Sequence, residues 1–173
     1  MRRIQVIIAV LLVFIVGFVL GTGIKYLYET KSFQPYAWAE DSMPIILNCY
    51  GNDFSEAQFR RAMKFWERKG HKFGFYEHRP SKETCDNEYL DGFIILRKGG
   101  RFDHDSGVLA KTRRYTRLTT AFAAVITYRP GSQNLQWINE HELGHALGFA
   151  HYEADGHIMH PLFHKMDGKF WVP

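Results

Sequence analysis

The sequence predicts an α+β domain that follows a single apolar segment at the N-terminus. From residue 42 onward, strand-like and helix-like runs follow in the order strand, helix, three or four strands and a second helix, with no internal repeat. Residues 6–20, by contrast, contain no polar side chain. The remaining chain, roughly 130 residues, is long enough for one hydrophobic core and too short for two comfortable domains.

The apolar segment has the length and the flanks of a membrane span. Residues 21–24 extend it to roughly the 20 residues that cross a bilayer, and Arg2 and Arg3 precede it. Positive charge favours the cytoplasmic side, so the N-terminus is expected inside and the rest of the chain outside. A cleaved signal peptide shares the basic start and the apolar run and is the alternative. We therefore predict an anchor at 1–25, a linker at 26–41 and a folded domain at 42–173.

Charge and cysteine content narrow the class of protein. The chain has 22 Lys and Arg against 18 Asp and Glu, a net charge of +4, which is weak support for nucleic-acid binding. The densest basic stretch, residues 111–117, is expected to be a solvated strand or loop face. Cys49 and Cys85 are the only cysteines. An exported compartment would allow a disulfide between them, and two free buried thiols are the open alternative.

A first helix is predicted over residues 54–70. Ser55 and Gln58 form a capping-box signature at its start, and Gly70 supplies a stop. Apolar residues recur at helical spacing between these limits, so they should form the face that packs on the core. They are Phe59, Ala62, Met63 and Trp66.

Several other runs have the composition of strands, namely 44–50, 72–80, 92–98, 108–112 and 119–128. The run at 92–98 is continuously apolar at its centre, which is typical of a strand buried on both faces of a sheet. The stretch between Gly99 and Gly107 is charged and rich in glycine, which marks a loop. His71 and His78 border the predicted elements and are expected at the surface.

The second helix leads into the principal motif. Ser132 or Asn134 is expected to cap it. The motif "HELGHALGFAH", residues 141–151, places His141 and His145 one helical turn apart on one face, with Glu142 beside them. The apolar positions of this helix are Leu135, Ile138, Leu143 and Leu147.

The third histidine of the motif needs a break in the helix. His151 follows His145 by six residues, and a straight helix would carry it to another face. Gly148 can adopt a positive φ and end the helix, so that the chain turns back and brings His151 to the same ion. Three neutral imidazoles leave one coordination position open, which is the pattern of a catalytic zinc site.

The spacing H-E-x-x-H-x-x-G-x-x-H resembles that of the metzincins, zinc peptidases in which a methionine turn follows the motif. Met159 in "HIMHPLF" supplies the methionine, and together with Pro161 it makes the chain most similar to the matrixin branch. Residues 107–111 resemble the antiparallel edge strand that binds substrate in matrixins. The resemblance implies a metzincin-like domain with a mixed twisted sheet, two main helices and a Met-turn. The transmembrane helix predicted from the apolar run would precede this domain.

The resemblance also implies roles for individual residues. His141, His145 and His151 would hold one catalytic Zn²⁺, and Glu142 would act as the base toward water. Lys111 stands where matrixins usually have a histidine ligand of a structural zinc, so a second zinc is not expected. Leu109 and Ala110 would form hydrogen bonds with an extended substrate, which binds as an added strand. Pro161, Leu162 and Phe163 would wall the pocket beyond the scissile bond, with Met159 beneath the metal.

Three more histidines, His157, His160 and His164, crowd the segment after the motif. They are expected to lie around the ligands or at the surface, because His151 already fills the third ligand position. The predicted function is a zinc-dependent endopeptidase, anchored in a membrane as a single-pass protein with the catalytic domain outside. Its partners would be protein or peptide substrates and the membrane. A non-catalytic, zinc-containing peptide-binding module is the alternative, although a binder needs no base such as Glu142.

Overall fold

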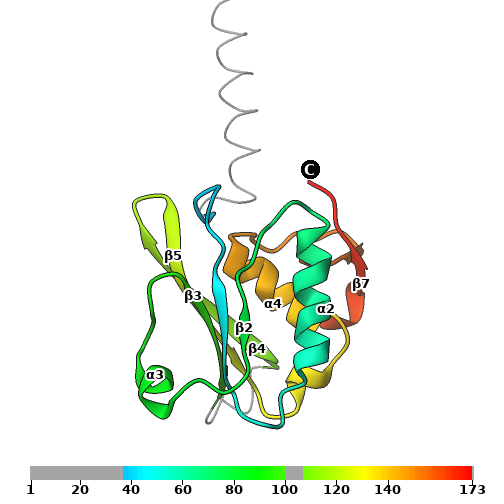
Figure 1. The fold of residues 1–173 in the computed structure, drawn as a ribbon. Helices are drawn as coiled ribbons and strands as arrows, with labels where there is room; N and C mark the ends of the chain where they lie inside the picture. The colour runs from blue at the N-terminus through cyan, green and yellow to red at the C-terminus, as the bar shows by residue number, and fades with distance from the viewer. Residues whose placement is uncertain (1–36, 100–106, 173) are drawn as a thin grey trace, which may run out of the picture.

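A five-stranded sheet lies at the centre of the computed structural model, which describes residues 37–99 and 107–172. The strand order is β2-β1-β3-β5-β4, and every neighbouring pair is parallel except β4 with β5, which is antiparallel (Figure 1). The mixed sheet was predicted, and β4 forms one of its edges. The strands are β1 (Ile45–Cys49), β2 (Tyr76–Glu77), β3 (Phe93–Lys98), β4 (Ala110–Arg117) and β5 (Thr120–Tyr128).

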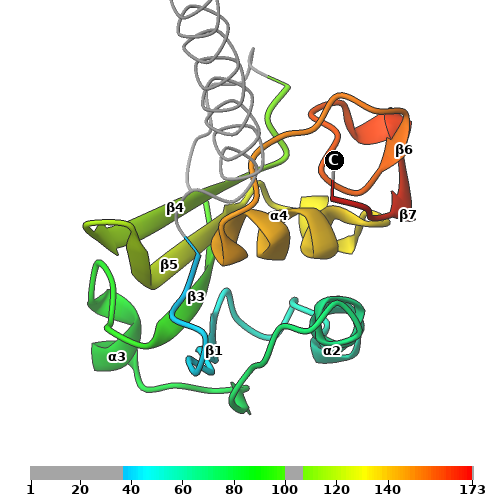
Figure 2. The same cartoon turned by 90° about the horizontal axis from the view of Figure 1, so that it is seen from above.

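Two main helices lie together on one side of the sheet, and a short helix lies on the other side (Figure 1, Figure 2). The main helices are α2 (Glu56–Glu67) and α4 (Ile138–Leu147), and the short one is α3 (Lys82–Asp86). Trp66 joins the main pair, because its indole Nε1 donates to the carbonyl of Glu140 at 2.8 Å. Two short strands near the C-terminus, β6 (Gly156–His157) and β7 (Met166–Lys169), form a separate parallel pair.

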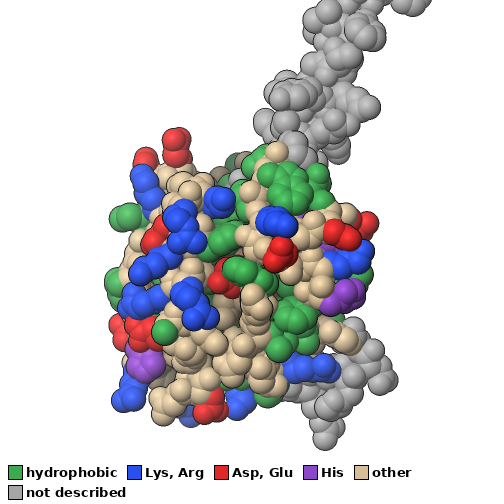
Figure 3. All heavy atoms as spheres, turned by 90° about the vertical axis from the view of Figure 1, so that its right-hand side faces the viewer, with side chains coloured by type: hydrophobic (Ala, Val, Ile, Leu, Met, Phe, Trp, Pro, Cys, Tyr) green, Lys and Arg blue, Asp and Glu red, His purple; other side chains and the backbone are tan. Residues whose placement is uncertain are grey.

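Helix α2 agrees with most of what was predicted for the first helix. The Ser55 hydroxyl accepts from the backbone N–H of Gln58 at 3.3 Å and so caps the first turn. The predicted apolar face is buried, and Phe65 is buried with it. Basic side chains gather on the outer surface of this side of the molecule (Figure 3), where α2 exposes Arg60, Arg61, Lys64 and Arg68.

Alternate residues of the central strands pack into two separate apolar clusters, one on each face of the sheet. Ile46, Ile94 and Ala124 lie in register and face the main core. The next residues along each strand, Leu47, Ile95 and Val125, are also in register and form a smaller apolar cluster. Burial on both faces is typical of parallel strands, and it confirms the prediction for residues 92–98.

A disulfide joins Cys49 at the end of β1 to Cys85 in α3, which resolves the alternative that the sequence left open. Cys49 packs against the smaller apolar cluster. The bond therefore holds the short helix close to that cluster, and no free cysteine remains in the chain.

Two strand predictions had wrong bounds. The run at 72–80 forms a strand only at Tyr76–Glu77. The strand expected at 108–112 begins at Ala110 and continues to Arg117, so the basic stretch is an edge strand rather than a loop. Its exposed positions include the charged residues Lys111 and Arg113. A prediction from the pattern of apolar residues therefore ends the strand too early.

The predicted cap of the second helix is wrong. The Ser132 hydroxyl lies 2.6 Å from the carbonyl oxygen of Leu109 and 2.8 Å from that of Arg129, so it is engaged away from the helix. Helix α4 instead begins after Trp137, which has a left-handed backbone with φ of 67°. The Trp137 ring lies against Gly168, where an added Cβ would come within 2.5 Å of the ring. This close packing explains how a bulky residue holds an unfavourable conformation.

The predicted anchor at 1–25 lies outside the described residues. Within residues 37–99 and 107–172, no helix combines the length and the apolar character needed to cross a bilayer. The last residues of the predicted linker contact the domain: the indole of Trp38 donates to the carbonyl of Ala146 at 2.8 Å, and Trp38 forms a β-bridge with Ala121.

Candidate metal centre

Helix α4 and the turn that follows bring the three predicted histidines together. Gly148 ends the helix with φ of 116°, as the motif predicted. The backbone N–H of Phe149 then donates to the carbonyl of Gly144 at 3.0 Å, and the chain reverses. One nitrogen from each of His141, His145 and His151 lies within 4.8 Å of the other two.

The histidine rings are oriented by backbone carbonyls. Nδ1 of His141 lies 2.8 Å from the carbonyl oxygen of Ile158, and Nδ1 of His145 lies 2.8 Å from that of Phe149. We assign the proton to Nδ1 in both rings, because a carbonyl can only accept. The unprotonated Nε2 atoms are then free to act as ligands, as is usual for histidines that bind metals.

Burial also keeps these rings neutral. It lowers the pKa of His141 to about 4 and the pKa of His145 to about 3. Burial lowers the pKa of the more exposed His151 as well. Neutral imidazole is the form that binds a metal ion.

The triad fits zinc. Nε2 of His145 and Nε2 of His151 are 3.1 Å apart. Ligand nitrogens around a tetrahedral zinc, with bonds of about 2.0–2.1 Å, are separated by roughly 3.3 Å. Among the described residues, this triad is the only cluster of three potential ligands found.

Glu142 lies beside the triad and is almost fully buried. Burial raises the pKa of its carboxyl to about 7, while a hydrogen bond from Thr112 acts in the opposite direction. That bond runs from the Thr112 hydroxyl to Oε2 of Glu142 at 2.6 Å. Thr112 was not predicted from the sequence, although strand alternation would have placed it on the same face of β4 as Ala110.

The Met-turn packs against helix α4 at Gly144. Met159 and Trp66 are fully buried, and both lie against Gly144. A Cβ at Gly144 would come within 2.4 Å of Met159 Sδ and 2.6 Å of Trp66 Cζ2. The glycine between the two helical ligands therefore lets α4 approach Met159 closely.

Two of the three additional histidines are not at the surface. His157 is fully buried, where its Nδ1 accepts from the N–H of Met159 at 3.0 Å and its Nε2 lies 3.1 Å from the carbonyl oxygen of Trp171. The buried His160 accepts at Nδ1 from the N–H of Leu162 at 2.9 Å. Both rings thus shape the backbone around Met159, while His164 is exposed.

Two further histidines were expected at the surface. His71 packs against Trp66 and Phe149 and is half-buried, so that expectation is wrong. Burial accordingly lowers its pKa. His78 remains partly exposed, 3.4 Å from a carboxylate oxygen of Glu56.

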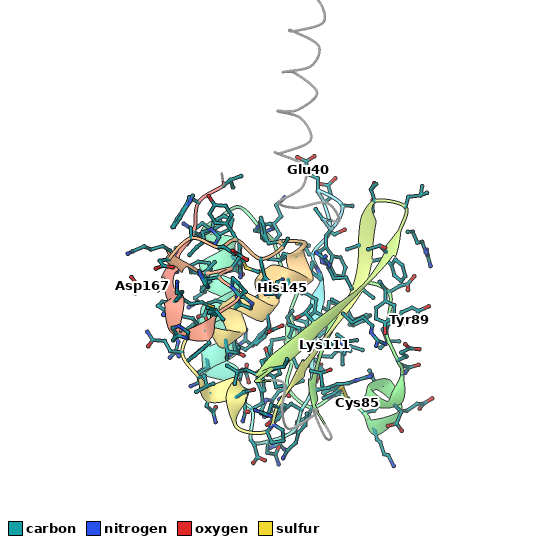
Figure 4. All side chains as sticks on the ribbon, turned by 180° about the vertical axis from the view of Figure 1, so that it is seen from behind. Glu40, Cys85, Tyr89, Lys111, His145 and Asp167 are labelled. Carbon is teal, nitrogen blue, oxygen red and sulfur yellow. A yellow bond between two sulfur atoms is a disulfide. The ribbon has the colours of Figure 1, made fainter. Side chains whose placement is uncertain are left out.

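The metal centre opens into a cleft of about 690 Å³. Strand β4 lines one side, and the segment after Met159 lines the other. In Figure 4, Lys111 and His145 mark the strand and the helix that border this region. The cleft brings together all the predicted substrate-contacting residues, which are Leu109, Ala110, Pro161, Leu162 and Phe163.

The site has the architecture of a metzincin-type zinc peptidase. Helix α4 carries two histidines and a glutamate, and the third histidine follows a glycine turn. An antiparallel edge strand and a buried Met-turn complete the site. The Matrixin family model matches residues 48–172, and the chain belongs to the matrixin family. It is therefore a metalloendopeptidase with a catalytic zinc ion. A comparison with curated proteins gives no match.

Proposed function

We propose that Glu142 is the catalytic base of this endopeptidase and that His141, His145 and His151 hold its zinc. The observation that carries the proposal is the position of one buried carboxylate beside the triad, inside the cleft. Zinc, when bound, polarises the scissile carbonyl and makes a water molecule more acidic. Glu142 would accept a proton from the attacking water and deliver it to the departing amine.

Thr112 would hold this base in position. Its hydroxyl reaches Glu142 from the opposite side of the cleft, so it restricts the rotation of the carboxylate about its last bond. Of the two carboxylate oxygens, Oε2 receives this bond, so Oε1 would be the one that accepts the proton from water. Thr112 is therefore a positioning residue in this proposal and does not exchange protons with the substrate.

The open edge of β4 would bind an extended substrate as an added strand. The carbonyl of Leu109 is already occupied, since it accepts from the N–H of Arg129 at 2.9 Å and lies 2.6 Å from the Ser132 hydroxyl. The register pairs Ala110 with Tyr128, so backbone groups at Ala110 and Thr112 alternate with those bonded to β5 and face the open edge. Leu109 would contribute its side chain, whereas Ala110 would contribute backbone hydrogen bonds.

The substrate side chain after the scissile bond would enter the pocket walled by Pro161, Leu162 and Phe163. Among the described residues that line the cleft, Glu142 is the only acidic one, and Ile138 adds to the apolar lining of the cleft. An apolar guest is therefore favoured over a cationic one. The preference should be graded with size, because one methylene in such a pocket changes binding by only about 1–3 kcal/mol.

The apolar run at 6–20 supports a membrane anchor, with the N-terminus in the cytoplasm and the peptidase domain on the exported side. Protease added outside sealed vesicles of native orientation should digest the domain and spare a tag placed before Arg2. Protection of the domain would reverse the orientation. A mature chain that begins near residues 21–24 would instead support secretion after signal-peptide cleavage.

The test of the base is Glu142→Gln, which preserves shape and removes the proton acceptor. The full chain should still bind one zinc, while kcat for a peptide substrate should fall by about 10²–10⁴-fold. Glu140→Gln is the matched control, since Glu140 is a buried carboxylate of the same helix outside the cleft. Retained turnover in Glu142→Gln would assign the base elsewhere.

A further inference from the structure

The tip of the β4–β5 hairpin has an unusual residue at its first position. Register places Arg117 opposite Thr120, so the loop consists of Leu118 and Thr119. Leu118 has φ of 54° and is 96% exposed. Two-residue hairpin loops usually place Gly, Asn or Asp at positions with positive φ. A large apolar side chain here is unfavourable for the backbone and for solvation.

Packing does not account for this conformation. Among the described residues, the only other non-glycine residue with positive φ is Trp137, whose ring packs closely against Gly168. Leu118 has no comparable burial. An outlier that the fold itself does not stabilise points to a role outside the folded domain.

The tip is nevertheless held firmly from behind. Tyr115 and Phe122, one on each strand of the hairpin, flank Tyr89, with ring centroids 4.2 Å and 5.7 Å from the Tyr89 ring. The Arg117 guanidinium lies 4.6 Å from the Phe122 ring centroid and 3.0 Å from a carboxylate oxygen of Asp91. The hairpin therefore presents Leu118 on a braced support.

The hairpin tip lies at the end of the domain where the chain enters. The N–H of Ala121 donates to the carbonyl of Ala37 at 3.0 Å, and Ala121 is only three residues from Leu118. Figure 1 shows the hairpin and the first described residues at the same end of the sheet. Twelve residues, 25–36, separate this point from the apolar run, and they can span at most about 40 Å.

We infer that the hairpin tip is a second contact with the lipid bilayer, in which Leu118 enters the interface and Arg117 lies at the level of the lipid phosphates. This inference rests on the proposed membrane anchor. A single apolar side chain with an adjacent cation suits a shallow interfacial contact, and the short tether makes a weak contact effective. The cleft, on the side that faces the viewer in Figure 4, would remain open to substrates beside the membrane.

The experiment uses the full chain reconstituted in vesicles of phosphatidylcholine and phosphatidylglycerol in equal parts. Both native cysteines are in the disulfide, so Leu118→Cys offers one site for an environment-sensitive fluorophore. The label should shift to the blue and be quenched severalfold by lipids that carry a nitroxide on the acyl chain. Asn134→Cys is the matched control, because Asn134 is exposed beyond the opposite end of β5 and should stay unquenched.

A second variant separates membrane contact from folding. Leu118→Gly suits the positive φ, so it should raise Tm by a few degrees and leave turnover of a soluble peptide unchanged. It should also abolish the protection of the hairpin by vesicles against a soluble protease. A lower Tm in this variant would show that Leu118 serves the fold and would overturn the inference.

The remaining outcomes distinguish this inference from the anchor. If carbonate extracts the full chain from the vesicles, the anchor is wrong and the hairpin contact is overturned with it. If the chain stays in the vesicles but the label at 118 is no more quenched than that at 134, only the hairpin contact is overturned. A blue shift that requires an added protein substrate, and not lipid, would assign the tip to substrate binding and would also overturn the inference.

Discussion

The two sides of the cleft are built in different ways. On the helix side, His141 and Glu142 are buried, and carbonyl groups orient the ligand rings. On the strand side, Lys111 is exposed, and the edge of β4 is open to an added strand. The helix side therefore depends on the identity of its side chains, whereas the strand side depends on the course of the chain. Thr112 is an exception, because its side chain crosses from one side to the other.

The largest effect is expected on the helix side. His145→Ala should remove both zinc and hydrolysis, since it deletes a half-buried ligand and the described residues offer no second set of three ligands. Lys111→Ala on the strand should change neither by more than about twofold, because its exposed charge contributes little. The zinc content and kcat/KM of the two variants should be measured and compared with those of the parent. Equal losses in the two variants would refute the division between the sides.

Gly144→Ala should reduce stability without altering any ligand. Its Cβ would overlap Met159 and Trp66, and overpacking of this kind costs about 1–3 kcal/mol. Chemical denaturation of the zinc-loaded protein should show the loss. Thr116→Ala, at an exposed position on β4, is the control and should stay within about 0.5 kcal/mol of the parent. An unchanged midpoint for Gly144→Ala would mean that α4 can move away from Met159 at little cost.

Thr112→Val tests a side chain that links the two sides. Loss of a hydrogen bond to a charged group is worth about 1.5–3 kcal/mol, so kcat should fall by roughly 10–100-fold. KM and zinc content should change little, because Thr112 neither binds the metal nor supplies the substrate pocket through its hydroxyl. Thr112→Ser keeps the donor and should restore most of the rate. If valine keeps the rate while serine lowers it, the methyl group matters and not the hydrogen bond.

The smallest effect is expected from the substrate backbone. N-methylation of successive peptide bonds in a substrate should weaken kcat/KM about 2–10-fold at positions that pair with Ala110 or Thr112. Positions between them should be tolerated, since alternate residues of an added strand point their N–H groups away. A scan of steady-state rates along one peptide would reveal this period of two. A uniform loss at every position would argue against strand addition at β4.

The same contrast explains what the sequence could predict. The histidine triad and the glycine turn were predictable because a helix repeats regularly and zinc accepts few ligand sets. The buried face of α2 was also predictable from helical periodicity. The bounds of β4 could not be predicted, because the exposed Lys111 and Arg113 resemble residues of a solvated loop. Edge strands carry such charges where no second layer covers them.

Other features depend on contacts between distant residues. The start of α4 at Trp137 requires the space above Gly168, and the pairing of Cys49 with Cys85 requires α3 to lie beside β1. The burial of His157 and His160 follows from backbone groups within their own turn and from Trp171. No local pattern of apolar residues encodes these contacts. The sequence therefore did not decide between the alternatives for these residues, or it predicted that they lie at the surface.

The Cys49–Cys85 disulfide ties the stability of the peptidase to its redox surroundings. The two cysteines are 36 residues apart, and the segment between them contains the whole of α2, one of the two helices of the main core. Closing a loop of this length lowers the entropy of the unfolded chain by an amount worth about 4 kcal/mol, a large share of the 5–15 kcal/mol that typically stabilises a domain. A newly made chain in a reducing environment lacks this contribution. The enzyme would therefore reach its full resistance to unfolding only after it meets an oxidant.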